Sequence, residues 1–379
     1  MPNPIRNIAD RTYRVFTYQS VDRLPDLEFG YWPQTIRRWL KEGLPLSLTP
    51  EETTDMFSAK VDAYFGFDKG QSYEIPLKIK MEPPFEEQIL ERRAESVIMR
   101  DVDGVIAERY QHDSALSSIP RFIEFPVKTP ADWQAMKAHY RWEGLERQIS
   151  LAEIDAASQA YAAGKAIWVF FTGFYGLLRG WMGTEHLSFA FYDQPGMLHE
   201  MVEHWAELCV RQIEQLPAGL GIDGVSWWED MAGKNGPLVS PAVFREFLQP
   251  GYRRVMAALK ARGCVLGMVD CDGNPLNIVP NWLEEGVNIM FPLEVEAGVD
   301  PYRWRERFGK ELRLRGGIAK EPLVVGGKAI DRELERIKPL IEQGGYVPHL
   351  DHLAPPDIPL ANYCEYLEKK RRLICKVNL

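Results

Sequence analysis

The chain has 379 residues, of which 45% are hydrophobic and 26% charged, and its formal net charge is -9. This composition excludes a disordered chain, and the acidic balance argues against a nucleic-acid partner, because phosphate backbones are bound by basic faces. The longest apolar run, 166–178, is interrupted by Gly173 and Gly176 and is too short for a membrane span. The N-terminus has no apolar signal core, and the five cysteines form no Cys-x-x-Cys pair, so we expect a reduced, cytoplasmic protein without a membrane partner.

The N-terminal part of the chain predicts an arm followed by two strands, near 26–32 and around 57–66. The next segment, 72–110, lacks helical periodicity. We therefore expect a β-hairpin or small-sheet insertion there, with a turn at Asp103-Gly104.

From residue 166 onward one unit recurs along the chain. A short apolar run rich in β-branched or aromatic residues is followed by a polar loop and then by a longer amphipathic stretch. Continuous apolar runs of this kind are typical of parallel strands that are buried on both faces. The six strands predicted in this way are 166–171, 222–228, 264–269, 287–293, 312–317 and 345–350.

The stretches between these runs have helical periodicity. Residues 197–216 and 329–345 each place their apolar side chains on one face, and 240–248 opens with Ser240 as an N-cap before a proline. The predicted buried positions are Leu198, Val202, Trp205, Cys209 and Ile213 in the first helix and Ile330, Leu334, Ile337 and Ile341 in the second.

Alternating strands and helices require a parallel sheet, and the two earlier strands bring the count to eight. The prediction is an α/β protein, a (β/α)₈ TIM barrel formed by residues 1–379 as a single domain, because no change in composition marks a boundary. An open doubly wound sheet is the alternative. No Gly-x-Gly-x-x-Gly follows any predicted strand, so we do not predict a nucleotide cofactor.

Active sites of such barrels lie at the C-terminal ends of the strands, and acidic residues follow several of the predicted strands. These residues are Glu229, Asp270, Asp272 and Glu294, and His352 follows the last strand. Either aspartate could instead cap the next helix. Converging acids are costly without a cation or a proton, so the cluster predicts a divalent metal site or a carboxyl–imidazole pair for acid–base chemistry.

Aromatic residues also gather at the predicted strand ends. Trp32, Phe174, Tyr175 and Trp228 are candidates for a pocket around a flat ligand. Trp227 and Trp228 must point in opposite directions in a strand, so at most one of them faces a ligand.

Three longer stretches, 192–203, 227–255 and 316–368, resemble the uroporphyrinogen decarboxylase superfamily, and a weaker likeness covers 28–45. The resemblance implies a (β/α)₈ barrel. True decarboxylases of this superfamily hold the carboxylates of a porphyrinogen with an arginine-rich N-terminal segment, whereas residues 17–33 contain a single arginine. His352 does stand at the position of the C-terminal histidine of the decarboxylases.

The other branch of the superfamily contains corrinoid-dependent methyltransferases. Their zinc-binding members read His-x-Cys-Gly-Asn after the fifth strand and have a late cysteine before Pro-Pro. Here Asp270-Cys271-Asp272-Gly273-Asn274 stands in place of the first motif, and His352 stands in place of the late cysteine. The resemblance therefore implies Asp270, Asp272 and His352 as ligands of a divalent metal, with zinc favoured, and Cys271 pointing away. Such oxygen and nitrogen donors suit an ether or amine leaving group better than a thiol.

The leading hypothesis is a methyltransferase component that moves a methyl group from a small methylated substrate, with methoxyaromatics as candidates, to a corrinoid on a partner protein. A homodimer is left open. The alternatives are a decarboxylase acting on a porphyrinogen or smaller carboxylate, and a non-catalytic barrel that binds a ligand or partner. The catalytic candidates are Asp270, Asp272, His352 and Glu229, and the substrate-binding candidates are Trp32, Phe174, Tyr175, Trp228 and Glu294.

Overall fold

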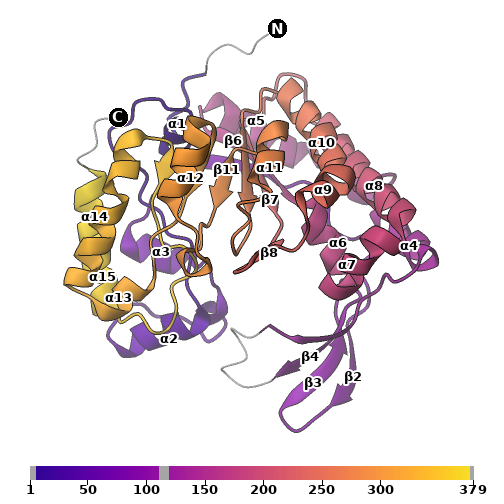
Figure 1. Ribbon diagram of the computed structural model, residues 1–379, viewed down its shortest axis with the longest axis horizontal. Helices are drawn as coiled ribbons and strands as arrows, with labels where there is room; N and C mark the ends of the chain where they lie inside the picture. The colour runs from indigo at the N-terminus through magenta and orange to yellow at the C-terminus, as the bar shows by residue number, and fades with distance from the viewer. Residues whose placement is uncertain (1–5, 111–118, 376–379) are drawn as a thin grey trace.

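The computed structural model describes residues 6–110 and 119–375 and is built around a curled parallel sheet with helices on its outer side (Figure 1). We call this the main sheet. All six strands predicted after residue 166 are present in it. In spatial order its strands are β1 (Ser72–Ile75), β6 (Ala166–Thr172), β7 (Gly224–Trp228), β10 (Leu266–Asp270), β11 (Ile289–Phe291), β12 (Arg313–Arg315) and β13 (Tyr346–Val347).

The helices alternate with these strands, as the periodicity predicts, and every predicted apolar position of the two long helices is buried. Ser240 caps its helix by accepting from the backbone of Val243. Among the described residues no helix is long and apolar enough to cross a membrane. The helices are α1 (Arg11–Phe16), α2 (Pro33–Lys41), α3 (Ala59–Phe65), α4 (Pro130–Lys137), α5 (Leu151–Ala162), α6 (Phe174–Met182), α7 (Thr184–Asp193), α8 (Pro195–Glu214), α9 (Pro241–Val243) with the π-helical turn Phe244–Leu248, α10 (Gln249–Ala261), α11 (Val279–Glu285), α12 (Pro301–Phe308), α13 (Glu321–Val325), α14 (Lys328–Gln343) and α15 (Leu360–Ile374).

The two strands predicted near the N-terminus are not formed as expected. The strand around 57–66 is wrong, because this segment is helix α3: Val61 and Phe65 are buried four residues apart, and Gly66 ends the helix in the left-handed conformation with φ 73°. The segment 26–32 is extended but makes only one bridge, between Tyr31 and Ala354. The described residues thus form a seven-stranded curled sheet consistent with a TIM barrel, and closure by an eighth strand stays a prediction.

The predicted β insertion is present, but it starts later than residue 72. Residues 72–75 are β1, which pairs in parallel with β6 in the main sheet. The insertion is an antiparallel sheet that projects from the body of the molecule (Figure 1), and the predicted turn at Asp103-Gly104 joins its second and third strands. Its strands are β2 (Gln88–Arg92), β3 (Ser96–Arg100), β4 (Ile106–Tyr110) and β5 (Arg121–Glu124), and the short strands β8 (Ala232–Gly233) and β9 (Gly236–Pro237) pair separately.

Alternation along the strands separates the two faces of the main sheet. Trp227 and Val269 are fully buried, and Trp227 packs against Tyr252 of the outer helix α10. Their neighbours Trp228 and Asp270 point the other way and are only partly buried. We call this second side the concave face, and it carries the side chains discussed below.

A buried ion-pair network joins the N-terminal arm to the C-terminal helix. The fully buried ammonium of Lys370 on α15 lies 2.9 Å from Asp26 and 2.6 Å from Glu28. The other oxygen of Glu28 accepts a hydrogen bond of 3.1 Å from the backbone N–H of Leu350. The network therefore holds the loop that follows β13, and with it His352.

Replacing Lys370 with methionine is expected to lower the free energy of unfolding by about 3–5 kcal/mol, because the buried carboxylate of Glu28 loses its counter-ion and Asp26 keeps only Arg371. The matched control is Lys369→Met, which removes a neighbouring surface lysine paired with Asp331 and Glu365 and should cost less than about 1 kcal/mol. Urea denaturation of the two variants measures the difference. Equal destabilisation of both would contradict a central role for the network.

Candidate active site

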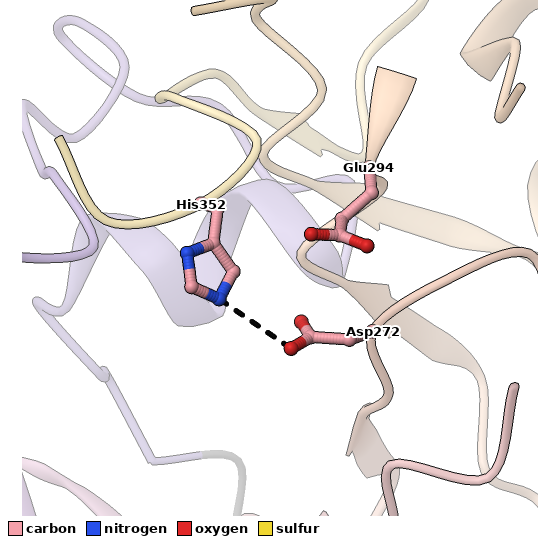
Figure 2. A group of neighbouring side chains, drawn as sticks. All are labelled: Asp272, Glu294 and His352. Carbon is pink, nitrogen blue, oxygen red and sulfur yellow. Dashed lines mark ion pairs between the residues drawn. The ribbon is translucent and has the colours of Figure 1, made fainter. Parts of the chain in front are cut away.

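Three side chains from separate loops converge at the C-terminal edge of the main sheet. Asp272 follows β10, Glu294 follows β11 and His352 follows β13, and Figure 2 shows the three pointing toward one another. The Nε2 atom of His352 lies 3.4 Å from Oδ2 of Asp272. One ligand atom from each residue lies within 4.8 Å of the others, and all three residues are partly buried. We call this set the acid–imidazole cluster.

The conformation of the loop that carries Asp272 depends on a glycine. Gly273 has a φ of 77°, and a Cβ atom there would lie 2.6 Å from the carbonyl oxygen of Ala232. Only glycine fits this close approach. In this conformation its N–H donates to Oε2 of Glu294 at 2.8 Å, which links the two acidic loops of the cluster.

A second group of acids adjoins the first. Ligand atoms of Asp230, Asp270 and Asp272 also lie within 4.8 Å of one another, so Asp272 belongs to both groups. We call this second set the three-aspartate group. Burial, followed by repulsion from the other two aspartates, raises the pKa of Asp270 well above its ordinary value. Burial and the charge of Asp272 raise the pKa of Asp230 as well, although Arg179 lies 3.5 Å away.

The expected ligand set of Asp270, Asp272 and His352 is therefore not the one that the geometry brings together. Glu294, predicted as a substrate-binding residue, takes the third position beside Asp272 and His352. The reason is depth: Asp270 is the last residue of β10 and pairs in register with Phe291, whereas Asp272 and Glu294 lie beyond the strand ends. Asp270 consequently belongs to the three-aspartate group.

The donor atoms of the acid–imidazole cluster fit a divalent cation. Two carboxylates and one imidazole are the oxygen and nitrogen ligands found at zinc and other borderline ions. Cys271 does not take part, since its buried Sγ accepts from the backbone N–H of Met231 at 3.4 Å. Burial also raises the pKa of the Cys271 thiol well above its ordinary value, which keeps it neutral. The expectation that Cys271 points away agrees with these contacts.

Aromatic rings form one side of the cluster. The ring of Trp32 stacks on His352 with centroids 6.0 Å apart, and the ring of Phe29 meets the same imidazole edge-on at 5.5 Å. Trp32 thus lies where the sequence analysis expected a ligand-contacting residue. Phe29 was not singled out there, although it belongs to the same predicted segment, 26–32.

The remaining aromatic candidates divide between the two faces of the sheet. Trp228 is partly buried on the concave face, with the guanidinium of Arg179 5.1 Å from its ring. Phe174 is buried against Trp227 on the opposite face, so its position does not support a ligand contact. Tyr175 is buried too, and burial raises its pKa to about 12.

Glu229 lies apart from the acid–imidazole cluster, at the start of helix α6. Its fully buried carboxylate accepts from the N–H of Gly176 at 2.7 Å and is hydrogen-bonded to the hydroxyl of Tyr252. A Cβ at Gly173 would lie 2.2 Å from the Glu229 carboxyl carbon, so the chain passes very close to it. These contacts stabilise the loop after β6. They do not support the predicted catalytic role of Glu229.

Further charged groups lie at this edge of the main sheet, outside the predicted site residues. The carboxylate of Asp351 is fully buried, accepts from the N–H of Val295 at 2.9 Å and lies 3.6 Å from Lys320, and burial raises its pKa to about 6. Arg315 and His349 lie deeper on the concave face, 3.3 Å apart. Arg315 could have been identified as a candidate site residue from the sequence, because it is a charged residue inside a strand that is predicted to be buried.

The Glu229 carboxyl gives a test by pH. Burial raises its pKa from 4.5 to about 7, so the folded state holds a proton that the unfolded chain loses. This stabilisation is complete below about pH 4.5 and is lost as the pH rises through about 7, with a slope of at most roughly 1.4 kcal/mol per pH unit. Glu229→Gln should lower the slope by this contribution, and Glu246→Gln, at an exposed position, should not. Parallel pH profiles of wild type and Glu229→Gln would contradict the assignment.

Comparison with known proteins places the chain in a family. The family model for Uroporphyrinogen decarboxylase (URO-D) matches residues 113–372. Among curated proteins, the uroporphyrinogen decarboxylase of Granulibacter bethesdensis is 24% identical over 192 residues, which are 50% of this chain and 52% of that protein. The uroporphyrinogen decarboxylase of Sphingopyxis alaskensis is 28% identical over 190 residues, 48% of this chain and 51% of that protein. These matches span about half the length of the curated relatives.

Among solved structures, a methyltransferase from Methanosarcina mazei has the same fold, with a TM-score of 0.56 and 14% sequence identity. The likeness covers 96% of this chain and 98% of the methyltransferase, so it includes the curled sheet and the helices around it. The match to the family model extends over more than half of the sequence, including every strand of the main sheet after β1. The chain belongs to the uroporphyrinogen decarboxylase family.

Proposed function

We propose that the protein is a methyltransferase component, which takes a methyl group from a small methylated substrate and passes it to the corrinoid of a partner protein. The observation that carries the proposal is the convergence of Asp272, Glu294 and His352 at the C-terminal edge of the main sheet. Asp272 and His352 are also two of the positions that correspond, by resemblance, to zinc ligands in the methyltransferase branch.

The acid–imidazole cluster would hold a divalent cation, with zinc favoured. A cation bound there would withdraw electron density from the ether oxygen or amine nitrogen of the substrate. In the transfer, the bond from the methyl carbon to that oxygen or nitrogen would break, and its electron pair would stay with the leaving group, which would take up a proton from solvent. The electron pair of the new carbon–cobalt bond would come from the Co(I) corrinoid of the partner protein. The rings of Trp32 and Phe29 beside His352 would exclude water from this side of the reaction.

The charge of this edge also distinguishes the proposal from porphyrinogen decarboxylation. A polycarboxylate needs several guanidinium groups, and carboxylates repel it. Among the described residues at the edge, the acids are Asp230, Asp270, Asp272, Glu294 and Asp351, and the basic residues are Arg179, Arg315 and Lys320.

The single arginine of residues 17–33 does not change this balance. Arg23 makes two hydrogen bonds of 2.7 Å to Asp68, so its guanidinium is already paired with a carboxylate. Decarboxylation of a porphyrinogen or a smaller carboxylate is the second candidate, and the names of the curated relatives favour it.

A methyl-transfer assay tests the proposal directly. Purified protein loaded with zinc should form methylcobalamin from cob(I)alamin and a methoxyaromatic or methylamine donor. Asp272→Asn should lower the rate by about 100-fold or more, because it removes a carboxylate from the cluster. The matched control is Asp357→Asn, at an exposed position in the loop that follows His352, and it should leave the rate unchanged.

Two results would speak against the proposal. One is the absence of methylcobalamin from every donor tested at full zinc occupancy. The other is release of carbon dioxide from uroporphyrinogen by the same preparation, which would favour the decarboxylase.

A further inference from the structure

Arg315 places a positive charge on the concave face of the main sheet, below the acid–imidazole cluster. It is the last residue of β12, and its side chain runs across the neighbouring strand β11. The guanidinium lies 4.7 Å from the ring of Phe291 on β11, and its Nη1 reaches Sδ of Met268 on β10 at 3.5 Å. The group therefore faces the interior of the curled sheet, on the same side as Asp270.

The guanidinium makes no direct contact with a carboxylate, although the negative charge of Asp270 acts on it from a greater distance. Within the described part of the chain, no carboxylate oxygen lies within 4.0 Å of it, and its hydrogen bonds go to weak acceptors. Its Nε donates to Nε2 of His349 at 3.3 Å, and Nδ1 of His349 lies 2.6 Å from the carbonyl oxygen of Leu350. His349 thus uses Nδ1–H for the backbone and offers Nε2 as an acceptor, which is the neutral imidazole form.

A partly buried cation with this environment is incompletely paired by the protein. An imidazole nitrogen and a thioether sulfur satisfy only part of the five N–H groups of an arginine, and neither carries a negative charge. Burial lowers the pKa of Arg315 to about 10, so the group still carries its charge at neutral pH. A carboxylate that entered from the concave side would supply two parallel hydrogen bonds and the missing charge.

One aromatic side chain connects Arg315 with the acid–imidazole cluster. The ring of Phe29 lies 4.5 Å from Phe291, which carries the guanidinium on its face, and 5.5 Å from His352 of the cluster. It also lies 6.4 Å from His349. The rings of Phe291 and Phe29 therefore form a continuous line of contacts from the arginine to the cluster, along a surface that favours ring contacts.

We propose that Arg315 binds the carboxylate of an aromatic acid, whose methylated oxygen or nitrogen is then directed toward Asp272, Glu294 and His352. The inference rests on the proposed methyl transfer for the role of the methylated end of the ligand, and it names the substrate class. One guanidinium serves one carboxylate, so the ligand is a monocarboxylate, and Arg315 determines specificity by orienting it.

Binding alone tests this assignment, without any methyl transfer. Isothermal titration of zinc-loaded protein with 4-methoxybenzoate and with the neutral 4-methoxybenzyl alcohol compares two ligands that differ mainly in charge. Wild type should bind the acid at least about tenfold more tightly than the alcohol. Arg315→Met should lose this preference while its affinity for the alcohol stays the same, and Arg315→Lys should keep part of it, since it keeps the charge without the fork.

The matched control is Arg313→Met on the same strand. Arg313 is bonded to the backbone oxygens of Phe16 and Glu311 at the other end of β12, so its loss should leave the preference for the acid intact. Circular dichroism shows whether each variant is folded. If Arg315→Met does not fold, the comparison of acid and alcohol binding by the wild type still tests the assignment.

Several results would overturn the assignment of Arg315. These are equal affinity of wild type for acid and alcohol, no binding of the acid at millimolar concentration, or an unchanged preference in folded Arg315→Met. Failure of the methyl-transfer proposal gives a different pattern, in which the acid is bound selectively through Arg315 but no methylcobalamin forms.

Discussion

Repulsion between carboxylates is the constraint on which the site depends. Asp272 belongs to both the acid–imidazole cluster and the three-aspartate group, so at least five ionisable side chains share one edge of the sheet. Groups of like charge at this spacing need protons or a cation. The two groups solve the problem differently: burial and mutual repulsion raise the pKa values of Asp230 and Asp270, which favours protons there. The acid–imidazole cluster has an imidazole donor, which favours a cation.

The fold holds these charges in place from both ends of the chain. Lys370 on the last helix binds Asp26 and Glu28 of the N-terminal arm, and Glu28 in turn holds the backbone of Leu350. The arm also supplies the aromatic rings beside His352. The strands of the main sheet alone would therefore not form the site, because the loop after β13 is fixed by segments that are more than 300 positions apart.

The sequence predicted the regular part of the structure and placed all three cluster residues at the strand ends, but it gave only Asp272 and His352 as metal ligands. Buried parallel strands are continuous apolar runs, and residues just past them must lie at one edge, which is why Asp272, Glu294 and His352 were predicted to lie together. Helix α3 was mistaken for a strand because the segment is short and has few apolar residues, such as Val61 and Phe65, from which a helical periodicity could be recognised. The ligand position of Glu294 and the depth of Asp270 depend on how far each loop extends beyond its strand, which periodicity does not encode. Arg315 and Phe29 were missed because their roles arise only from contacts between distant strands.

The acid–imidazole cluster and Arg315 together describe a site for a flat molecule with one negative end and one methylated end. The central claim is that a divalent cation occupies the cluster, and anomalous scattering at the zinc edge from crystals grown with zinc tests it most directly. The account predicts one anomalous peak bounded by Asp272, Glu294 and His352. A peak among Asp230, Asp270 and Asp272 instead, or no peak at this edge of the sheet, would contradict it.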